Sequence, residues 1–351
     1  MISIILIFSL TISDIFRAGI WSGLEGIQDE NLKELAKDLP ELAMACRSKG
    51  TVKNYITAFN RFKKWAKDYD EINVLPANPT YVALYLSHLT RISVTHSPVS
   101  LGFYSISWAH KTAGYEDPTT HQLVKMVRES AVRNLGKGSN KKQPLEARDI
   151  REIVNKFGKS DCSLMDLRTV TLCVLCFAGF LRFDEVSNLR FSDIEFQETY
   201  LRLFIEKSKT DVCRVGTWVY IAKTYTSSCP HTILNRYVRL ANFKVDSEKY
   251  LFRSVSYYKS LNKHKLRPAD KPITYTCARE LILQVFKEIG LNEKEFGTHS
   301  LRAGGATAAA ENYVCDRLFK KHGRWRSERA KDGYVKESLD QLLSVSLNLG
   351  L

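Results

Sequence analysis

The chain contains 351 residues, of which 44% are hydrophobic and 26% charged, a composition typical of a globular protein long enough for two domains with separate cores. Its formal net charge is +14, which fits a polyanionic partner, most simply nucleic acid, although an acidic membrane surface or solubility alone would also account for it. Eight cysteines are scattered along the chain, and its Cys-x-x-Cys, Cys173 and Cys176, lies among apolar residues without a second pair at zinc-finger spacing. We therefore expect buried thiols in a reducing compartment, and neither a metal site nor a cofactor.

Residues 1–28 begin with a mostly apolar stretch that ends near Phe16. This stretch is too short to span a bilayer comfortably, lacks the basic start of a signal peptide, and is followed by no clear small-residue cleavage site. We interpret 1–28 as an apolar leader, either packed or disordered, or as an artefact of where the reading frame begins. A secretory signal is the alternative, and it would conflict with a DNA partner.

Residues 29–136 show helical periodicity without a strand pattern, which predicts a small α-helical domain. Within it, four aromatic residues from Tyr55 to Trp65, including Phe59 and Phe62, recur at helical spacing, so we expect them in the core. The opposite face of the same helix carries basic and amide side chains. Such a face is usually only solvated, but in a chain of this charge it is also a reasonable surface for phosphate contacts. Its residues are Lys53, Asn54, Arg61, Lys63 and Lys64.

Residues 137–144 contain Gly, Ser and Lys without an apolar side chain. This composition is typical of a flexible basic linker, so we place the domain boundary there. The second domain, 145–351, opens with a helical pattern, and the nearly continuous apolar run at 163–180 predicts a buried central helix that Gly179 can end. Arg182 follows this break. Glu185 lies one turn later, where a carboxylate can orient the guanidinium group if the helix resumes; Arg190 is the rival arginine.

Residues 199–222 predict a β-hairpin with a polar turn between two strands of alternating apolar residues. We assign Leu201, Leu203 and Ile205 to the first strand, and Val215, Trp218 and Val219 to the returning strand. Amphipathic helices are predicted at 231–241 and 276–290. Between them lies a basic irregular stretch, 257–272, which either contacts DNA or is an ordinary loop.

The stretch from Thr298 to Tyr334 combines several side chains suited to phosphate chemistry. His299 and Arg302 lie three residues apart, so a helix places both on one face, where they can address the same ligand. Phosphate is the natural candidate, because a guanidinium group matches its oxygens bidentately and an adjacent imidazole can exchange a proton with an oxygen bonded to phosphorus. Trp325 precedes Tyr334 by nine residues.

Together these residues resemble the tyrosine recombinase (phage integrase) family, in particular its Cre-like and transposon-borne members. The family pattern has an Arg in a Leu-Arg-x-x-Glu context, a hairpin Lys, a His-x-x-Arg, a His or Trp, and a Tyr nine residues later. The resemblance covers roughly 147–351 by motif and the preceding helical region by layout. It implies a mainly α fold with a small antiparallel β-sheet: a helical, SAM-like core-binding domain that clamps DNA, followed by the catalytic domain.

The resemblance also implies roles for these residues. Tyr334 would attack the phosphorus while His299 accepts its proton. Arg182 and Arg302 would hold the two non-bridging oxygens more strongly as charge builds in the transition state. Glu185 would orient Arg182.

The remaining roles are less sharply defined by the motif. Trp325 would donate its indole N–H to a phosphate oxygen, with His322 as the rival for this position. The family's general acid is a lysine near a hairpin turn, which favours Lys209, with Lys207 as the alternate. Tyr313 is a second candidate nucleophile, but its place in an Ala-rich helix predicts packing. The amphipathic tail after Tyr334 either packs on its own chain or docks on a neighbouring protomer.

We therefore expect a homo-multimer that breaks and rejoins double-stranded DNA through a 3′-phosphotyrosyl intermediate, in recombination or integration. We expect no cofactor, metal, membrane or small-molecule substrate, and the sequence shows no P-loop and no DDE-like carboxylate spacing. Two alternatives stay open: a domesticated DNA-binding protein of the same fold, or a type IB topoisomerase-like relaxing enzyme. The expected location is the nucleus of a eukaryote, or otherwise the cytoplasm and nucleoid, without secretion.

Overall fold

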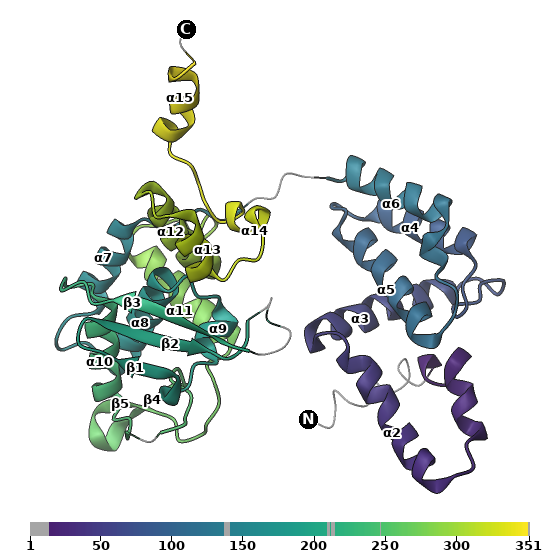
Figure 1. Ribbon diagram of the computed structural model, residues 1–351, viewed down its shortest axis with the longest axis horizontal. Helices are drawn as coiled ribbons and strands as arrows, with labels where there is room; N and C mark the ends of the chain where they lie inside the picture. Colours follow the sequence, from purple (N-terminus) through teal and green to yellow (C-terminus); the bar gives the residue numbers. More distant parts are fainter. Residues whose placement is uncertain (1–13, 137–140, 209–210, 212–214, 246, 350–351) are drawn as a thin grey trace. The chain divides into compact units, whose positions relative to one another are not determined.

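The computed structural model describes residues 14–136, 141–208, 211, 215–245 and 247–349. The chain divides into two compact units, residues 1–139 and 140–351. Most described elements are helices, and the strands form only two small antiparallel sheets (Figure 1). This architecture confirms the predicted mainly α fold class.

Unit 1 is a group of helices around one apolar core. Phe59 and Phe62 are 1% and 0% exposed, whereas Tyr55 and Trp65 are partly buried against the same core, so the predicted aromatic stripe does face inward. Ile15 also lies in this core, which means that part of the predicted leader packs on the unit. The elements are η1 (Gly19–Gly26), α2 (Glu30–Ala45), α3 (Lys49–Ala66), α4 (Pro79–Ile92), α5 (Ser97–Ala113), η2 (Pro118–Thr120) and α6 (Gln122–Asn134).

Local sequence signals set several helix boundaries in unit 1. The Ser48 hydroxyl accepts the backbone N–H of Thr51 and caps α3, and the Asn78 side chain caps α4 immediately before Pro79. Both arrangements satisfy N–H groups that a helix start leaves without partners. At the other end of a helix, Gly114 adopts φ 76° and terminates α5, a left-handed conformation that glycine adopts at low cost.

The polar face of α3 differs in one position from the expected open surface. Lys53, Asn54, Arg61 and Lys64 are exposed. Lys63 is only half-exposed, and its ammonium group forms an ion pair with the carboxylate of Asp14. Lys63 therefore offers less uncompensated charge to a phosphate than its neighbours do.

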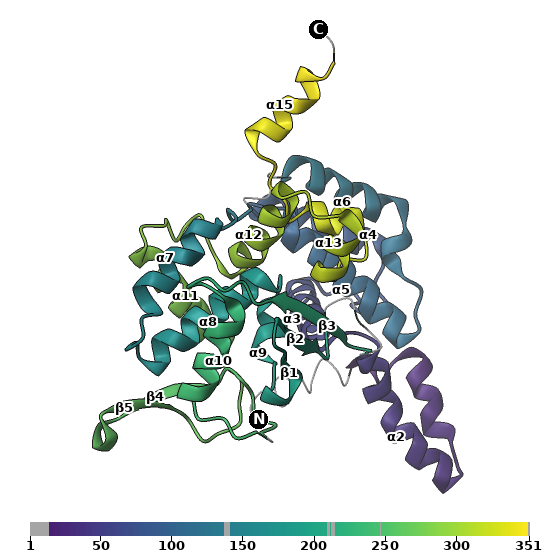
Figure 2. The ribbon, with the colours of Figure 1, turned by 60° about the vertical axis from the view of Figure 1, so that its left-hand side comes forward.

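Helix α8 (Leu164–Ala178) forms the buried centre of unit 2, as its apolar run predicted. Cys173 and Cys176 lie on it as free thiols, 0% and 4% exposed, and burial raises the pKa of Cys173 to about 12, so this pair matches the expectation of buried thiols. Four helices pack around α8 (Figures 1 and 2). They are α7 (Ala147–Phe157), α10 (Pro230–Leu240), α11 (Tyr275–Glu288) and α12 (Thr298–Glu311).

The predicted hairpin is present as part of a three-stranded antiparallel sheet. It contains β1 (Ile194–Phe196), β2 (Tyr200–Ile205) and β3 (Thr217–Ala222), ordered β1-β2-β3. The inward residues of β2 are all buried, as their alternation predicted. Val215, however, was wrongly assigned to the returning strand: it is 79% exposed. The cause is Gly216, which turns the chain at φ 73°, so pairing starts only at Thr217, opposite Ile205.

The basic stretch 257–272 is not irregular as expected but contains most of a second hairpin, β4 (Val255–Tyr258) and β5 (Lys263–Leu266), joined by η4 (Lys259–Leu261). It projects from unit 2 in Figure 2. Asn262 closes the turn at φ 45°, and the buried Arg253 ties the hairpin base to the core by donating to the carbonyl oxygen of Arg267 at 2.9 Å. Backbone pairing and this anchor were not visible as a strand pattern, because the stretch lacks apolar alternation.

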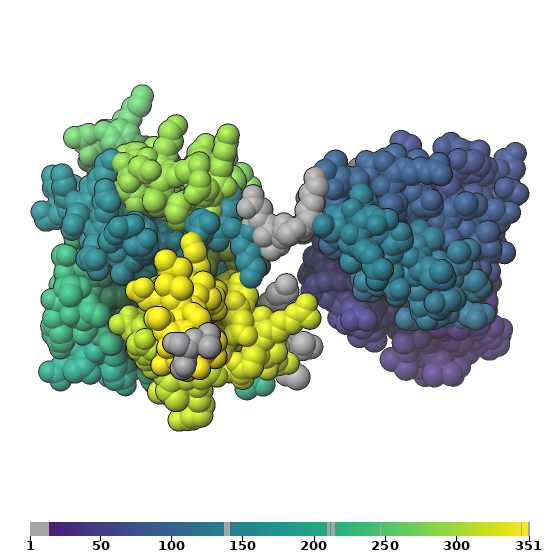
Figure 3. All heavy atoms as spheres, turned by 90° about the horizontal axis from the view of Figure 1, so that it is seen from above, coloured from purple at the N-terminus to yellow at the C-terminus, as the bar shows by residue number. Residues whose placement is uncertain are grey.

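The remaining elements of unit 2 are short. They are α9 (Phe183–Ser187), η3 (Phe191–Asp193), α13 (Asp316–Gly323), α14 (Glu328–Asp332) and α15 (Leu339–Leu347). Helix α15 extends away from the rest of the unit in Figures 1 and 2 and lies at its surface in Figure 3; Leu339 and Leu347 are 69% and 79% exposed. Within the described ranges, no helix is both long and apolar enough to cross a membrane.

Candidate active site

The turn between α8 and α9 holds the first arginine of the predicted set. Glu185, in the first turn of α9, accepts the backbone N–H of Arg182 with Oε2 at 2.8 Å and a guanidinium N–H of Arg182 with Oε1 at 2.7 Å. The Glu185 side chain is 2% exposed and that of Arg182 16%. Glu185 therefore holds both the backbone and the guanidinium group of Arg182, in the geometry expected of an orienting carboxylate.

Helix α12 brings the second arginine to the same turn, from far along the chain. Arg302 is 0% exposed, and its guanidinium group donates to the carbonyl oxygen of Phe180 and, at 2.7 Å, to that of Gly323. Its Nη1 lies 3.8 Å from Glu185 Oε2. The close approach depends on Gly305 of α12, because a Cβ there would lie 2.0 Å from the carbonyl oxygen of Phe177.

Two aromatic rings lie against the Arg302 guanidinium group. Its central carbon is 4.7 Å from the ring centroid of Trp325 and 4.9 Å from that of Tyr334, distances suited to cation–π attraction. The two rings are 5.6 Å apart, and Trp325 packs so closely over Gly323 that a Cβ there would meet the indole at 1.8 Å. Arg182, Glu185, Arg302, Trp325 and Tyr334 thus form one connected cluster.

Arg324 is a member of this cluster that the sequence reasoning missed. It is 9% exposed and donates to Glu185 Oε2 at 2.8 Å and to the carbonyl oxygens of Phe180 at 2.9 Å and His322 at 2.8 Å. The available signal was a charged residue directly before Trp325. This signal is weak, because a single Arg beside a predicted site residue belongs to no periodic pattern. The sequence therefore does not show whether its side chain is buried or exposed.

The cluster carries an excess of buried positive charge. Burial by itself would raise the pKa of Glu185, but the guanidinium groups of Arg324, Arg182 and Arg302 hold it below its ordinary value. Burial lowers the pKa of Arg302 and of Arg324, yet arginine starts from so high a pKa that both stay protonated at neutral pH. Three cations therefore share one carboxylate.

Several buried N–H groups in the cluster also lack an acceptor. Among the described residues, nothing accepts a hydrogen bond from Nε of Arg302, Nε of Arg324 or the indole N–H of Trp325. Buried donors without partners are costly. An anion with several oxygens, such as a phosphate, can supply the missing negative charge and can accept hydrogen bonds from Nε of Arg302 and the indole N–H of Trp325.

Two expected catalytic residues are not placed in the cluster by a described contact. His299 lies at the start of α12, three residues before Arg302, and is exposed. Lys209 lies outside the described residues. Its alternate, Lys207, lies two residues after the end of β2 and is exposed, so the position of the general acid stays a prediction.

The rival residues have other contacts. Arg190 donates to the carbonyl oxygen of Glu248 and pairs with Asp270 at 3.4 Å, so it stabilises the loop that precedes β4. His322 donates Nε2–H to the carbonyl oxygen of Ala178 at 2.9 Å, and burial lowers its pKa, which makes it a neutral anchor between α13 and α8. Both observations favour Arg182 and Trp325 for the proposed roles.

The packing expected for Tyr313 is wrong. Its side chain is 86% exposed, because α12 ends at Glu311 and Tyr313 follows with φ 54°. The left-handed conformation turns the chain away from the helix axis before the tyrosine could join its apolar face. Tyr313 is thus an unpacked phenol outside the arginine cluster.

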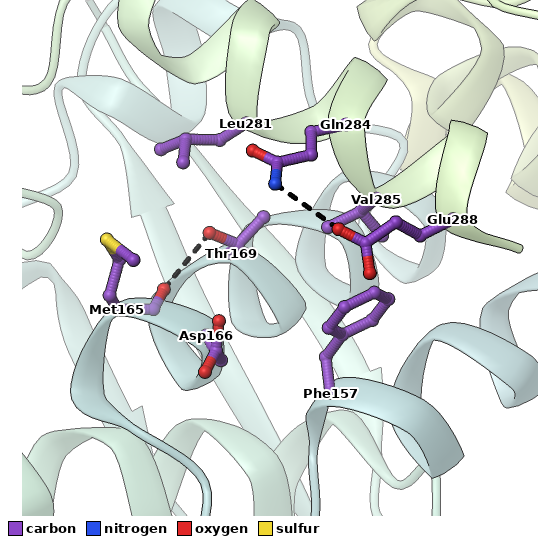
Figure 4. Close-up of a pocket in the computed structure, with 8 residues that line it drawn as sticks. All are labelled: Phe157, Met165, Asp166, Thr169, Leu281, Gln284, Val285 and Glu288. Carbon is purple, nitrogen blue, oxygen red and sulfur yellow. Dashed lines mark hydrogen bonds between the residues drawn. The ribbon is translucent and has the colours of Figure 1, made fainter.

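Two surface pockets lie away from this cluster, one lined by residues of unit 1 and the other by residues of unit 2. A pocket of about 60 Å³ between α7, α8 and α11 contains the hydrogen bond from Gln284 to Glu288 (Figure 4). It is too small for a substrate, and it shares no residue with the arginine cluster. Its lining consists of Phe157, Met165, Asp166, Thr169, Leu281, Gln284, Val285 and Glu288. The described residues also include no group of His, Cys, Asp and Glu side chains able to hold a metal ion.

Replacing Glu185 by Gln should destabilise unit 2 strongly. The change leaves the buried guanidinium groups of Arg302 and Arg324, and the partly exposed one of Arg182, without a counter-charge. Removing one partner of a buried ion pair typically costs about 3 to 5 kcal/mol. We expect a clear fall in the thermal unfolding temperature at pH 7. Because the pKa of Glu185 is depressed in the folded state, its stabilisation is present above the ordinary pKa of glutamate and disappears as the pH falls, so the difference between the two proteins should shrink in acid.

Glu195→Gln is the matched control for this substitution. Glu195 pairs with Arg202 at 2.6 Å, but both side chains are about one-third exposed, and solvent screens such pairs. Its unfolding temperature should stay close to that of the wild type. Equal effects of the two substitutions would show that the arginine cluster does not depend on Glu185.

Two arginines lie on one carboxylate, beside a tyrosine and an indole N–H. Such a set of side chains suits the stabilisation of a phosphate that a phenol attacks. The fold and this cluster are those expected of the class of DNA strand transferases that use a tyrosine. A family model described as the phage integrase family matches residues 143–339. The chain belongs to the phage integrase family of tyrosine recombinases.

Individual relatives agree with this assignment. The chain is 24% identical over 314 residues to an integrase/recombinase xerD homolog of Selenomonas ruminantium, covering 88% of this chain and 87% of that protein. Its fold resembles the XerH site-specific recombinase bound to palindromic difH substrate, with a TM-score of 0.60, 14% identity and coverage of 97% and 94%. It also resembles the Tn1549 transposon integrase in complex with transposon right end DNA, with a TM-score of 0.56, 11% identity and coverage of 98% and 99%.

Proposed function

We propose that this chain breaks and rejoins double-stranded DNA through a 3′-phosphotyrosyl intermediate, acting as a homo-multimer in recombination or integration. The observation that carries the proposal is the meeting of two arginines and a tyrosine at one point. Arg302 lies 4.9 Å from the Tyr334 ring centroid and 3.8 Å from the carboxylate that binds Arg182. Family membership and the DNA complexes among the similar solved structures support the same function.

In the proposed reaction, Tyr334 Oη attacks the scissile phosphorus. The bond between phosphorus and tyrosine oxygen forms as the bond to the 5′-oxygen breaks, the phenolic proton passes to His299, and Lys209 gives a proton to the departing 5′-oxygen, which leaves as a hydroxyl group. Arg182 and Arg302 stabilise the charge that builds on the non-bridging oxygens. A 5′-hydroxyl from another strand can reverse the step, because the phosphotyrosyl bond retains the free energy of the phosphodiester.

The arrangement of Arg302 indicates that the described site is closed. Its guanidinium group is fully buried, with the Tyr334 and Trp325 rings against it. A phosphate can reach the remaining N–H groups of Arg302 only if a ring moves aside. Because Tyr334 is the half-buried member of the pair, it is the ring expected to move, and the same motion would bring its hydroxyl group toward the phosphorus.

The exposed basic residues of α3 are proposed to bind DNA phosphates. Changing Lys53, Arg61 and Lys64 together to Gln should weaken duplex binding and lower the slope of log affinity against log salt by about 0.9 for each phosphate that the variant no longer neutralises. Lys63→Gln should lower it less, because Asp14 already neutralises that ammonium group. Titration of a labelled duplex at several salt concentrations measures both. An unchanged slope in the triple variant would remove α3 from the DNA-binding surface.

The function is tested with a duplex chosen by the protein itself from a random pool, then nicked beside each phosphate of the selected site in turn. After cleavage, the short fragment between the cut and the nick, which carries the 5′-hydroxyl, diffuses away. The cleavage step then cannot reverse, so an active enzyme accumulates as a covalent complex that a denaturing gel detects. Tight binding without a covalent complex at any nick would instead indicate a DNA-binding protein of this fold. Relaxation of supercoiled plasmid without site preference would indicate a topoisomerase.

The protein should act where DNA is kept: the nucleus of a eukaryotic host, or otherwise the cytoplasm with its nucleoid.

A further inference from the structure

We propose that Arg324 is a positioning residue for strand cleavage: through Glu185 and the carbonyl oxygen of Phe180, it holds Arg182 and Arg302 where they bind the scissile phosphate. This inference rests on the proposed function and adds to it a residue that lies between the family motifs. Arg324 would not touch DNA, because its side chain is only 5% exposed and its terminal guanidinium nitrogens are occupied by acceptors of the protein.

The hydrogen-bond acceptors of Arg324 are shared with both proposed phosphate-binding arginines. Glu185 Oε2 accepts from Arg324 at 2.8 Å and from the backbone N–H of Arg182 at 2.8 Å. The carbonyl oxygen of Phe180 accepts from Arg324 at 2.9 Å and also from Arg302. Arg324 therefore holds the Glu185 carboxylate, whose other oxygen, Oε1, binds the Arg182 guanidinium group, and it holds the carbonyl oxygen that binds the Arg302 guanidinium group.

Arg324 also connects the two halves of the site. It donates to the carbonyl oxygen of Gly179 at 3.3 Å on the α8 side and to that of His322 at 2.8 Å on the α13 side. Trp325 follows it directly, and Tyr334 follows ten residues later. The side chain thus ties the segment that carries the proposed nucleophile to the turn that carries Arg182.

The backbone conformation of Arg324 also indicates that its side chain has a function. Arg324 adopts φ 57° as the C-cap of α13, a left-handed conformation that glycine adopts freely and other L-residues adopt at a cost. Arg324 is a large charged residue in such a position, and its terminal nitrogens are buried and hydrogen-bonded. The free energy of these hydrogen bonds offsets the free-energy cost of the backbone conformation. Packing alone would be satisfied by glycine.

The test compares Arg324→Gly with Arg324→Lys and the wild type in the full chain. Glycine suits the backbone, so Arg324→Gly should fold, as checked by circular dichroism and thermal unfolding, and it should bind the selected duplex within about threefold of the wild type. Its single-turnover rate of phosphotyrosyl formation should fall about 10- to 100-fold, the loss typical of a small misplacement of catalytic groups. Lysine keeps the charge but cannot reach both shared acceptors, so it should restore little.

Rescue of the cleavage rate by added guanidinium ion distinguishes a positioning role from a purely structural one. Millimolar guanidinium chloride should restore part of the cleavage rate of Arg324→Gly by filling the vacated site, with no gain for the wild type. An Arg324→Gly protein that cleaves at the wild-type rate, or one whose DNA affinity and rate fall together without rescue, would overturn the positioning role while leaving the proposed function intact. A wild-type protein that forms no covalent complex would instead overturn the proposed function, and the positioning role with it.

Discussion

The Tyr334→Phe variant should bind the selected duplex as tightly as the wild type and form no covalent complex on any nicked substrate. The substitution removes only the phenolic oxygen, so the ring keeps its place against Arg302 and Trp325, 4.9 and 5.6 Å away by ring centroid. Without that oxygen there is no nucleophile. By the precedent of other covalent catalysts, the rate should fall on the order of 10⁶-fold, which is below detection in a gel assay.

Tyr313→Phe is the matched control for this loss. Tyr313 is 86% exposed and belongs to the same stretch of chain, so the identical chemical change there should leave the covalent complex at the wild-type level. Mass spectrometry of the trapped complex should place the DNA fragment on Tyr334. A complex that persists in Tyr334→Phe, or one that disappears in Tyr313→Phe, would assign the nucleophile to another residue.

Replacing Arg182 by Ala should slow cleavage about 10²- to 10³-fold. The Arg182 side chain is 16% exposed, whereas Arg302 is fully buried. Of the two proposed phosphate-binding arginines, Arg182 is therefore the one that a phosphate reaches more easily, and the change removes its guanidinium group. A preorganised donor contributes most where charge develops in the transition state, and removing one typically costs about 3 to 4 kcal/mol of barrier. Single-turnover kinetics on the nicked duplex, at saturating enzyme, isolates this step from binding.

Arg190→Ala is the control, because Arg190 is the rival arginine of the same region. It contacts the carbonyl oxygen of Glu248 and the carboxylate of Asp270, so its removal should lower the stability of that loop rather than the cleavage rate of the folded protein. Thermal unfolding of both variants separates the two effects. If Arg190→Ala abolishes cleavage at full stability and Arg182→Ala does not, the assignment of the first arginine is wrong.

Features that depend on neighbouring residues were readable from the sequence. The buried character of α8 and the pairing of β2 with β3 follow from hydrophobic periodicity, which a single segment displays by itself. The same local logic failed where the signal was short or absent. Val215 looked like a strand residue until Gly216 turned the chain, and the β4–β5 hairpin has no apolar alternation to reveal it.

Errors in the site have a related origin. Tyr313 was expected to pack because it continues an Ala-rich helical pattern, but α12 ends before it, and helix ends are the least certain feature of a periodic pattern. His322 was a rival for the position of Trp325 by residue type alone. Only its hydrogen bond to the carbonyl oxygen of Ala178, across a large separation in sequence, shows that it joins two helices.

By itself, the sequence determined which chemical groups are present and in what order: two arginines, a histidine, an indole and a phenol whose spacing matches one family. Only the tertiary structure decided that Glu185 is shared by Arg182, Arg302 and Arg324, and that Arg324 belongs to the site. The physical reason is that a buried ion cluster is made of contacts between residues far apart in the chain. Arg324 and Glu185 are 139 positions apart, and no local pattern records that one guanidinium group finds its carboxylate across the fold.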